Sequence, residues 1–364
     1  MRGKNRAWRP IDPGEIYGRA GVGPAIAARG APARCGRVSE DARALKSFLM
    51  HADHWPTVAV VGAGAVGCYF GGMLARAGVR VTLIGRARHM EAIGRDGLLL
   101  DGLRVHQRIP VTASTNIGER LRDAHVILFC VKTVNTETAA RELEPFLSPE
   151  AALLSFQNGV DNVDRICAAI HSRAIPVAVY VAAEMTAPGH VTHTGRGDLV
   201  IGHRAGWPRQ PALEPLAAMF EHAEVPCRIS DAIESELWTK MAMNCAYNAI
   251  SALTRARYGP MARFEPVRVL MQRAIAETVA VAHAEGVSLS ESAMVDAALQ
   301  LGEGMSRALS STAQDVARGR LTEIDSLNGY VARRGAALGI ATPVSDTLCA
   351  LVKLPEESAV PRQD

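Results

Sequence analysis

Three polar side chains on one predicted helix are the clearest candidates for acid–base chemistry. Lys240, Asn244 and Asn248 recur every four residues between Glu234 and Leu253, a spacing that places them on one stripe of a helix. Most other positions in this segment are apolar, so we expect a largely buried helix. Because an unpaired buried ammonium is costly, a ligand-lined cleft would explain the stripe. The alternative is a lysine that snorkels to solvent beside two hydrogen-bonded core amides.

The reduction of a ketone is chemistry that this stripe could support. A fixed ammonium can stabilise the negative charge that develops on the ketone oxygen during hydride addition, and it can then donate the proton. We therefore interpret Lys240 as a general acid, with Asn244 and Asn248 orienting hydroxyl and carboxylate groups of the substrate. The hydride itself would come from a cofactor.

A glycine-rich turn is the predicted site for that cofactor. The predicted strand at residues 58–61 runs directly into a G-x-G-x-x-G motif, and a helix and a second strand follow. In this frame the first glycine permits the turn, the second admits the pyrophosphate and the third lets the helix pack on the sheet. An ordinary glycine-rich turn is the alternative. The predicted cofactor-binding residues of the motif are Gly62, Ala63, Gly64, Ala65, Val66 and Gly67.

The end of the second predicted strand indicates which dinucleotide is preferred. A site for NAD usually carries an acidic residue there, about twenty residues after the turn. No Asp or Glu lies between Gly62 and Met90, and Arg86 follows the strand instead. Because a guanidinium can bind a 2′-phosphate bidentately, NADPH is favoured over NADH. A solvated surface arginine is the alternative reading of Arg86.

Further polar residues occupy positions where open α/β sheets bind ligands. Lys132 follows the third predicted strand, and Asn158 follows the fourth; both are candidates by position, although Asn-Gly is also a common turn dipeptide. Glu323 and Asp325 are predicted to open a late helix, where negative charge usually serves the helix dipole. These patterns select neither acid as catalytic.

The elements that must position these residues follow a strand–helix alternation. Short runs rich in β-branched residues predict strands at 58–61, 79–84, 126–131, 152–154 and 177–181. With intervening helical segments, they indicate a doubly wound, Rossmann-like α/β domain. Runs at 190–193 and 199–201 predict a hairpin whose turn is Thr194–Asp198. After about Ser230 the pattern becomes all-helical, and Gly339 and Pro343 mark the end of one late helix.

The 364 residues, 48% of them hydrophobic, can supply two cores. We expect a disordered or loosely ordered basic extension at residues 1–55, an NADP-binding Rossmann-like domain at 56–230, a helical substrate and catalytic domain at 231–355, and a tail at 356–364. Residues 1–50 hold ten Lys or Arg against four Asp or Glu, a net charge of +6. One hypothesis is that translation starts at Met50.

Composition argues against several other classes of protein. The remaining residues carry a net charge of −3 (+3 in total less +6), which argues against a nucleic-acid partner. The seven scattered cysteines form no CxxC pair and no Cys/His metal spacing, so we expect reduced thiols, no metal site and a cytoplasmic protein. No run approaches the roughly 18 apolar residues of a membrane span, so no membrane partner is expected.

Residues 57–353 together resemble the ketopantoate reductase (2-dehydropantoate 2-reductase) family. The resemblance rests on separated motifs whose order and spacing make it specific. They lie at residues 62–67, 130–133, 157–159, 237–245, 310–315 and 322–325. The resemblance implies an NADPH-binding Rossmann-like domain followed by an all-helical domain. It also implies the reduction of ketopantoate to (R)-pantoate, a precursor of pantothenate and coenzyme A.

The resemblance also implies roles for residues that the patterns above left open. Lys240 matches the catalytic lysine of the family, and Asn244, Asn248 and Ser311 match substrate-binding positions. Glu323 matches the glutamate that contacts the cofactor and helps to order the catalytic site.

On the cofactor side, Asn158 matches the asparagine that the family shares between cofactor and substrate. Lys132 matches a cofactor-binding lysine, and Arg86 matches the arginine that recognises the 2′-phosphate.

Three alternative functions remain open. A paralogous reductase of another small 2-oxo acid would keep the same motifs, and the loop at residues 255–260 departs from the family pattern. A relative of the 3-hydroxyacid dehydrogenases would also pair a helical lysine with an asparagine four residues on. A non-catalytic NADPH-binding sensor would not need Lys240. The expected partner is a small 2-oxo acid, and a homodimer is left open.

Overall fold

The computed structural model describes residues 55–103, 105–207 and 212–359. Contacts divide these residues into two units, at 55–241 and 242–359, and each is described by itself. The expectations for residues 1–54, including a start at Met50, lie outside the described residues. The domain boundary at residue 230 stays a prediction. In the described part of the chain, no helix combines the length and the apolar character needed to cross a membrane.

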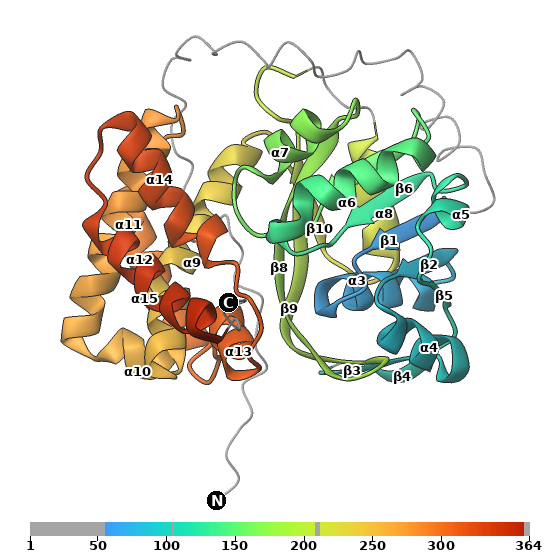
Figure 1. Cartoon of the computed structure of the whole chain (residues 1–364), viewed down its shortest axis with the longest axis horizontal. Coiled ribbons are helices and arrows are strands. Elements are labelled where there is room, and N and C mark those ends of the chain that lie inside the picture. Colours follow the sequence, from blue (N-terminus) through green and yellow to red (C-terminus); the bar gives the residue numbers. More distant parts are fainter. Residues whose placement is uncertain (1–54, 104, 208–211, 360–364) are drawn as a thin grey trace, which may run out of the picture. The chain divides into compact units, whose positions relative to one another are not determined.

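The first unit is built on a run of parallel strands (Figure 1), of which the central ones are buried. From one edge they run in the order β5 (Thr112–Ser114), β2 (Val81–Ile84), β1 (Val58–Val61), β6 (Val126–Phe129), β7 (Ala152–Ser155) and β8 (Ala174–Ala187). The predicted strands at 58–61, 79–84, 126–131, 152–154 and 177–181 are therefore confirmed, although the second begins at residue 81, the third ends at residue 129 and the last is part of the longer β8. A strand enclosed on both faces reads as a continuous apolar run, which is why these segments stand out in the sequence.

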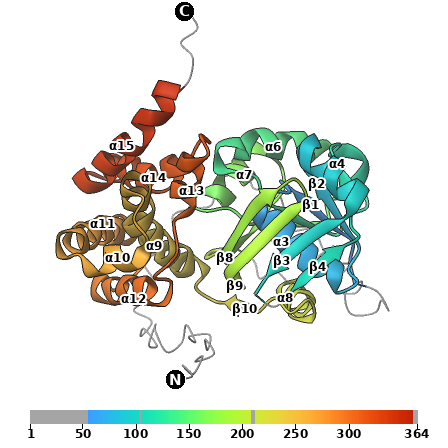
Figure 2. The same ribbon diagram turned by 90° about the horizontal axis from the view of Figure 1, so that it is seen from below.

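Helices cover both faces of this sheet, as a doubly wound fold requires. On one face α3 (Ala65–Arg76) packs on Val58 and Val60 of β1, and α8 (Leu213–His222) belongs to the same apolar cluster. The opposite face carries α6 (Thr136–Leu143) and α7 (Asn162–Ala169), which bury Ala59 and Val61. Figure 2 shows α6 and α7 together, away from α8. The predicted Rossmann-like class is confirmed, and the carboxyl ends of β1, β2, β6 and β7 carry the candidate cofactor residues.

The predicted hairpin around Thr194–Asp198 is wrong, because β9 (His190–Gly202) is one continuous strand. It pairs antiparallel with the long strand β8, and the chain reverses at Pro188 and Gly189 instead. The turn-like residues form bulges: Arg196 and Gly197 have φ values of 52° and 143°, and the register with β8 shifts at Gly197 and again at Thr194. A bulge accommodates such residues within a strand ladder. Predicting the turn from residue types alone therefore placed the chain reversal at the wrong residues.

The patterns also missed four strands that extend the sheet. Beyond β9 lie β3 (Leu98–Gly102) and β4 (His106–Ile109), while β10 (Cys227–Ser230) also pairs with β9 and β5 pairs with β2. In β4 three of four residues are exposed. An exposed edge strand needs no apolar alternation, so the segment carried no detectable strand signal.

After Ser230 the described chain is helical, as predicted. The helix α9 (Ile233–Thr254) continues from the first unit into the second. The second unit adds α10 (Tyr258–Arg263), α11 (Glu265–Ala284), α12 (Glu291–Gly304), α13 (Ser311–Ala317), α14 (Asn328–Leu338) and α15 (Pro343–Ala359). Its core includes Tyr247, whose hydroxyl donates to the Ala298 carbonyl at 2.7 Å. Gly339 ends α14 in the left-handed conformation, as expected.

The expected tail at 356–364 begins too early, because α15 continues to Ala359. The Glu356 carboxylate accepts a hydrogen bond from the Thr322 amide at 2.7 Å. This contact fastens the end of α15 to the segment before α14, so the helix does not stop at residue 355.

Candidate active site

The glycine turn between β1 and α3 is as tight as the motif predicts. Gly62 has a φ of 96°, and its amide donates to the Ile84 carbonyl at 3.0 Å. A Cβ at Gly62 would lie 2.7 Å from the Cys130 carbonyl carbon, and one at Gly67 would lie 2.6 Å from the Gly62 oxygen and 2.8 Å from Val60 Cγ1. Backbone and sheet therefore occupy the space of a side chain at both positions.

Gly64 differs from its two neighbours in the motif, because a Cβ there would meet nothing within 4 Å. It is the N-cap of α3, which has no side-chain cap and no acidic residue in its first turn. The first amides of a helix have no intrahelical partner, and the helix dipole favours an anion there. An open position over uncapped amides fits a pyrophosphate, so these residues fit a dinucleotide.

Arg86 and Lys132 follow the ends of the two strands that flank β1. Arg86 is exposed and lies two residues after Ile84, the residue whose carbonyl holds the Gly62 amide. Lys132 is half-buried and directly follows Val131, whose amide nitrogen would lie 2.7 Å from a Cβ at Gly62. Both cations therefore follow segments that contact the glycine turn.

Lys240 and Asn158 are brought together from positions 82 residues apart. The half-buried Lys240 lies on α9, and its Nζ donates to Asn158 Oδ1 at 2.9 Å. Asn158 follows the carboxyl end of β7, in the loop before α7. The ammonium is thus hydrogen-bonded inside the first unit, which argues against the snorkelling alternative. An ammonium with a fixed acceptor has the geometry required of a directed proton donor.

An aromatic ring that the sequence patterns missed also lies beside Lys240. The Lys240 Nζ is 5.9 Å from the ring centroid of Tyr180 on β8, and Arg196 Cζ is 4.1 Å from the same centroid. Arg196 pairs with Asp198 through two contacts of 2.9 and 2.6 Å. Bulges often redirect side chains next to active sites. The glycines around Arg196 were the only feature of the sequence that indicated this bulge.

The remaining polar candidates lie in the second unit. Asn244 is half-buried and Asn248 is buried on α9, and the Asn248 carbonyl accepts from Ser310 Oγ at 3.2 Å. Ser310 also caps α13 by accepting from the Ala313 amide at 3.0 Å, which leaves Ser311 exposed as the first residue of that helix. The α13 turn is therefore fastened to the asparagine-bearing half of α9.

The structure separates the two acids that the patterns left equivalent. Asp325 accepts two hydrogen bonds from Lys353 Nζ, at 2.9 and 3.1 Å, and lies 3.6 Å from Arg333 Nη1. This pairing raises the pKa of Lys353 and gives Asp325 a structural role. Glu323 is half-buried and precedes only a short 3₁₀ turn, Ile324–Ser326. It does not open an α-helix as expected, because Leu327 interrupts the helical backbone before α14.

Burial argues against a nucleophilic role for the described cysteines. None of the six is in a disulfide, and five of them are buried. Burial raises the pKa of Cys68, Cys227 and Cys245 to about 12, so these thiols stay protonated at neutral pH. Among the described residues no group of three or more His, Cys, Asp or Glu is arranged to hold a metal ion.

Comparison with known proteins identifies relatives over most of the chain. The family model described as ketopantoate reductase PanE/ApbA matches residues 58–206, and the model for the C terminal of the same family matches residues 232–356. A 2-dehydropantoate 2-reductase from Halobacterium salinarum is 33% identical over 302 residues, which cover 82% of this chain and 98% of the relative.

Solved structures agree with these matches. A PanE/ApbA family ketopantoate reductase from Ralstonia eutropha JMP134 is 45% identical, with a TM-score of 0.76 over 83% of this chain and 99% of its own. A 2-dehydropantoate 2-reductase from Geobacter metallireducens GS-15 is 27% identical, with a TM-score of 0.75 over 84% of this chain and 100% of its own.

Proposed function

The chain belongs to the ketopantoate reductase family, and on that premise we propose that it reduces 2-dehydropantoate to (R)-pantoate with NADPH, using Lys240 as the proton donor. Like the other members of this family, the chain is an oxidoreductase that acts on CH–OH groups. The observation that carries the proposal is the 2.9 Å hydrogen bond from Lys240 Nζ to Asn158 Oδ1. Pantothenate biosynthesis is the corresponding pathway.

The proposed mechanism assigns the proton to a lysine held at a fixed acceptor. The nicotinamide, when bound, supplies the hydride to the carbonyl carbon. The Lys240 ammonium stabilises the negative charge on the carbonyl oxygen and donates a proton to that oxygen. Asn158 Oδ1 accepts a second ammonium hydrogen and so directs the group. The three donors of an ammonium allow both contacts at once.

We assign the parts of the cofactor to residues in and around the glycine turn. We assign the pyrophosphate to residues 62–67, where Gly64 leaves space and the first amides of α3 are uncapped. Arg86 is proposed to bind the 2′-phosphate, which is the basis for preferring NADPH over NADH. Lys132 is proposed to bind the cofactor because it follows the segment that packs against Gly62.

The remaining roles follow the family pattern residue by residue. Asn244, Asn248 and Ser311 are proposed to bind the substrate, and Glu323 is proposed to contact the cofactor and to order the catalytic site. Asn158 is proposed to serve both ligands. Residues 56–230 would then be the NADP-binding domain and residues 231–355 the substrate and catalytic domain, while a homodimer stays a prediction.

A comparison of substrates and cofactors tests this proposal. We expect NADPH-dependent reduction of ketopantoate to have a higher kcat/KM than reduction of pyruvate, 2-oxoisovalerate or phenylglyoxylate, and NADPH to be preferred over NADH. Preference for another of these acids would make the chain a paralogous reductase with the same mechanism. Binding of NADPH without turnover of any of the acids would contradict the proposed activity and support a sensing role.

A further inference from the structure

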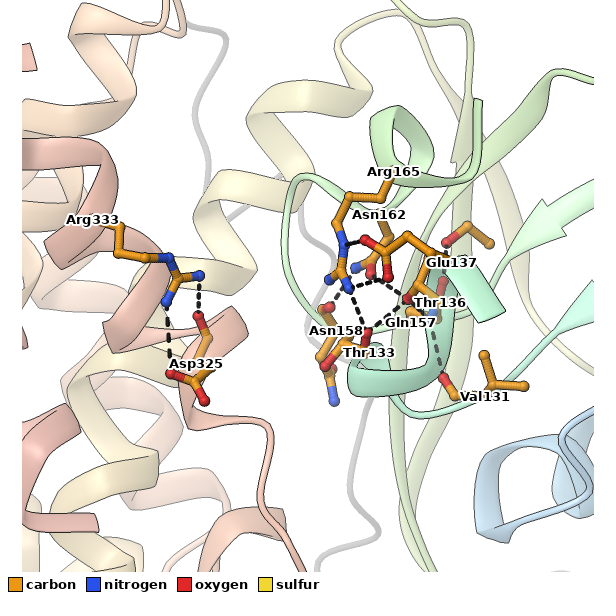
Figure 3. Close-up of polar contacts among 11 residues, drawn as sticks. Val131, Thr133, Thr136, Glu137, Gln157, Asn158, Asn162, Arg165, Asp325 and Arg333 are labelled. Carbon is orange, nitrogen blue, oxygen red and sulfur yellow. Dashed lines mark hydrogen bonds and ion pairs between the residues drawn. The ribbon is translucent and has the colours of Figure 1, made fainter. Parts of the chain in front are cut away.

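The loop that carries Asn158 is held by buried side chains that have no role in the proposed mechanism (Figure 3). Asn162, the first residue of α7, is 3% exposed, and its Nδ2 donates to the Asn158 carbonyl at 2.6 Å. The side chain of Asn158 accepts from Lys240 while its backbone carbonyl is bound by Asn162. Asn162 therefore binds the residue that supplies the Lys240 acceptor.

Gln157 fixes the same loop from the other side of Asn158. It is 5% exposed, and its Nε2 donates to Thr136 Oγ1 at 2.7 Å and to the Val131 carbonyl at 3.1 Å. Its Oε1 accepts from Ser155 Oγ at 3.2 Å. A buried amide with its donors and acceptor in use has one favoured orientation. Gln157, the residue directly before Asn158, is therefore held in a single place.

An ion pair fastens α7 to the segment that follows β6. Arg165 donates to both carboxylate oxygens of Glu137, at 2.7 and 2.9 Å, and Arg165 Nη2 donates to the Thr133 carbonyl at 2.7 Å. The Arg165 guanidinium lowers the pKa of Glu137, so the pair is charged at neutral pH. Figure 3 shows Arg165, Glu137, Gln157 and Asn162 gathered around the two loops.

The network also reaches the glycine turn. Val131, whose carbonyl accepts from Gln157, lies so close to Gly62 that a Cβ at Gly62 would approach the Val131 nitrogen to 2.7 Å. A continuous series of packed or hydrogen-bonded groups therefore links Gly62 through Val131, Gln157 and Asn158 to Lys240. The same series of contacts thus connects the cofactor turn with the acceptor of the ammonium.

We propose that Asn162 and Gln157 are positioning residues, which set Asn158 Oδ1, and through it the Lys240 ammonium, at a fixed place relative to the cofactor turn. The inference rests on the proposed function, in which Lys240 donates the proton. Neither side chain needs to touch a ligand for this role. Its consequence is that loosening the loop lowers kcat, because a small displacement of a reacting group has a large effect on rate.

A double-mutant cycle tests whether Asn162 acts through Asn158. The assay is kcat at saturating NADPH with the best 2-oxo acid of the panel above. We expect Asn162→Ala to lower kcat by about ten- to a hundredfold. In an Asn158→Ala background, Asn162→Ala should lower kcat further by less than about twofold, since the side chain that it positions is gone.

The matched control is Asp164→Asn on the same helix. This substitution weakens the 2.7 Å contact from Arg204 Nη2 to Asp164 without touching the Asn158 loop, and kcat should stay at the wild-type value. If Asn162→Ala does not fold, Asn162→Ser replaces it in the cycle. An equal fold-loss in both backgrounds would mean that Asn162 is merely structural and would overturn the proposal.

A crystal structure of the Asn162 variant separates this inference from the proposed function. We expect the distance from Lys240 Nζ to Asn158 Oδ1 to exceed hydrogen-bond range, whereas 2.9 Å is found in the wild-type chain. An unchanged distance would overturn the inference whatever the activity. If the wild-type protein reduced none of the acids, the proposed function would fail, and this distance would still decide the positioning role.

Discussion

Adding one methyl group at Gly64 or at Gly67 should separate cofactor binding from stability. A Cβ at Gly64 meets no protein atom within 4 Å, and its backbone, at φ −87° and ψ −160°, is open to any residue. Gly64→Ala should therefore leave the free energy of unfolding of the unliganded protein within about 0.5 kcal/mol of wild type. Restriction of the unfolded chain and the slightly poorer N-cap act in opposite directions.

The same substitution should weaken NADPH binding, because the methyl group occupies the space that we assign to the pyrophosphate. Overpacking of this kind costs about 1–3 kcal/mol, which corresponds to an increase in Kd of about fivefold to about 150-fold. Gly67→Ala should instead destabilise the unliganded protein by about 1–3 kcal/mol, because its Cβ would lie 2.6 Å from the Gly62 oxygen.

Two assays check the pair: titration of protein fluorescence with NADPH for the Kd, and denaturant unfolding without cofactor for stability. Gly64→Ala should change only the Kd for NADPH, whereas Gly67→Ala should change the free energy of unfolding. A Gly64→Ala protein that binds NADPH as tightly as wild type would refute the placement of the pyrophosphate over this turn.

Three further predictions concern single contacts. Arg86→Asp should shift the ratio of kcat/KM towards NADH, because a carboxylate repels a 2′-phosphate; an unchanged ratio would remove Arg86 from the site. Tyr180→Leu should lower kcat by about two- to fivefold through the lost ring contact with Lys240, whereas Tyr180→Phe should keep the wild-type kcat, and equal losses would exclude a role for the ring face. Glu137→Gln should be less stable than wild type at neutral pH in denaturant unfolding. Because Arg165 lowers the pKa of Glu137, that difference should shrink as the pH falls from about 4.3, the ordinary value in an unfolded chain, through the folded pKa; a difference independent of pH would contradict this.

The parts of the fold that were predictable are those where local chemistry permits one solution. Gly62 and Gly67 lie where backbone and sheet exclude a side chain, so the motif itself specifies the turn. The buried strands β1 and β6 read as apolar runs because both of their faces are covered. The helix α9 followed from its length and composition, and Lys240 from its place on the stripe.

The remaining features depend on partners that are distant in the sequence. The strand β9 continues through Thr194–Asp198 only because β8 pairs with it, and the exposed strand β4 owes its form to β3. From its position Asn158 could be either a ligand-binding residue or part of a turn, and its contact with Lys240 cannot be read from the sequence. Asn162 looks like an ordinary first residue of a helix. Periodicity describes one element at a time, so hydrogen bonds between loops carry no signature in it.

The central claim is that Lys240 donates the proton in the reduction of ketopantoate, and one measurement tests it most directly. Steady-state reduction of ketopantoate by NADPH is compared for the wild-type protein and Lys240→Ala, with the Kd for NADPH measured for both. We predict a fall in kcat of about a hundredfold or more, with cofactor binding retained. A Lys240→Ala protein that reduces ketopantoate at the wild-type kcat would contradict the account.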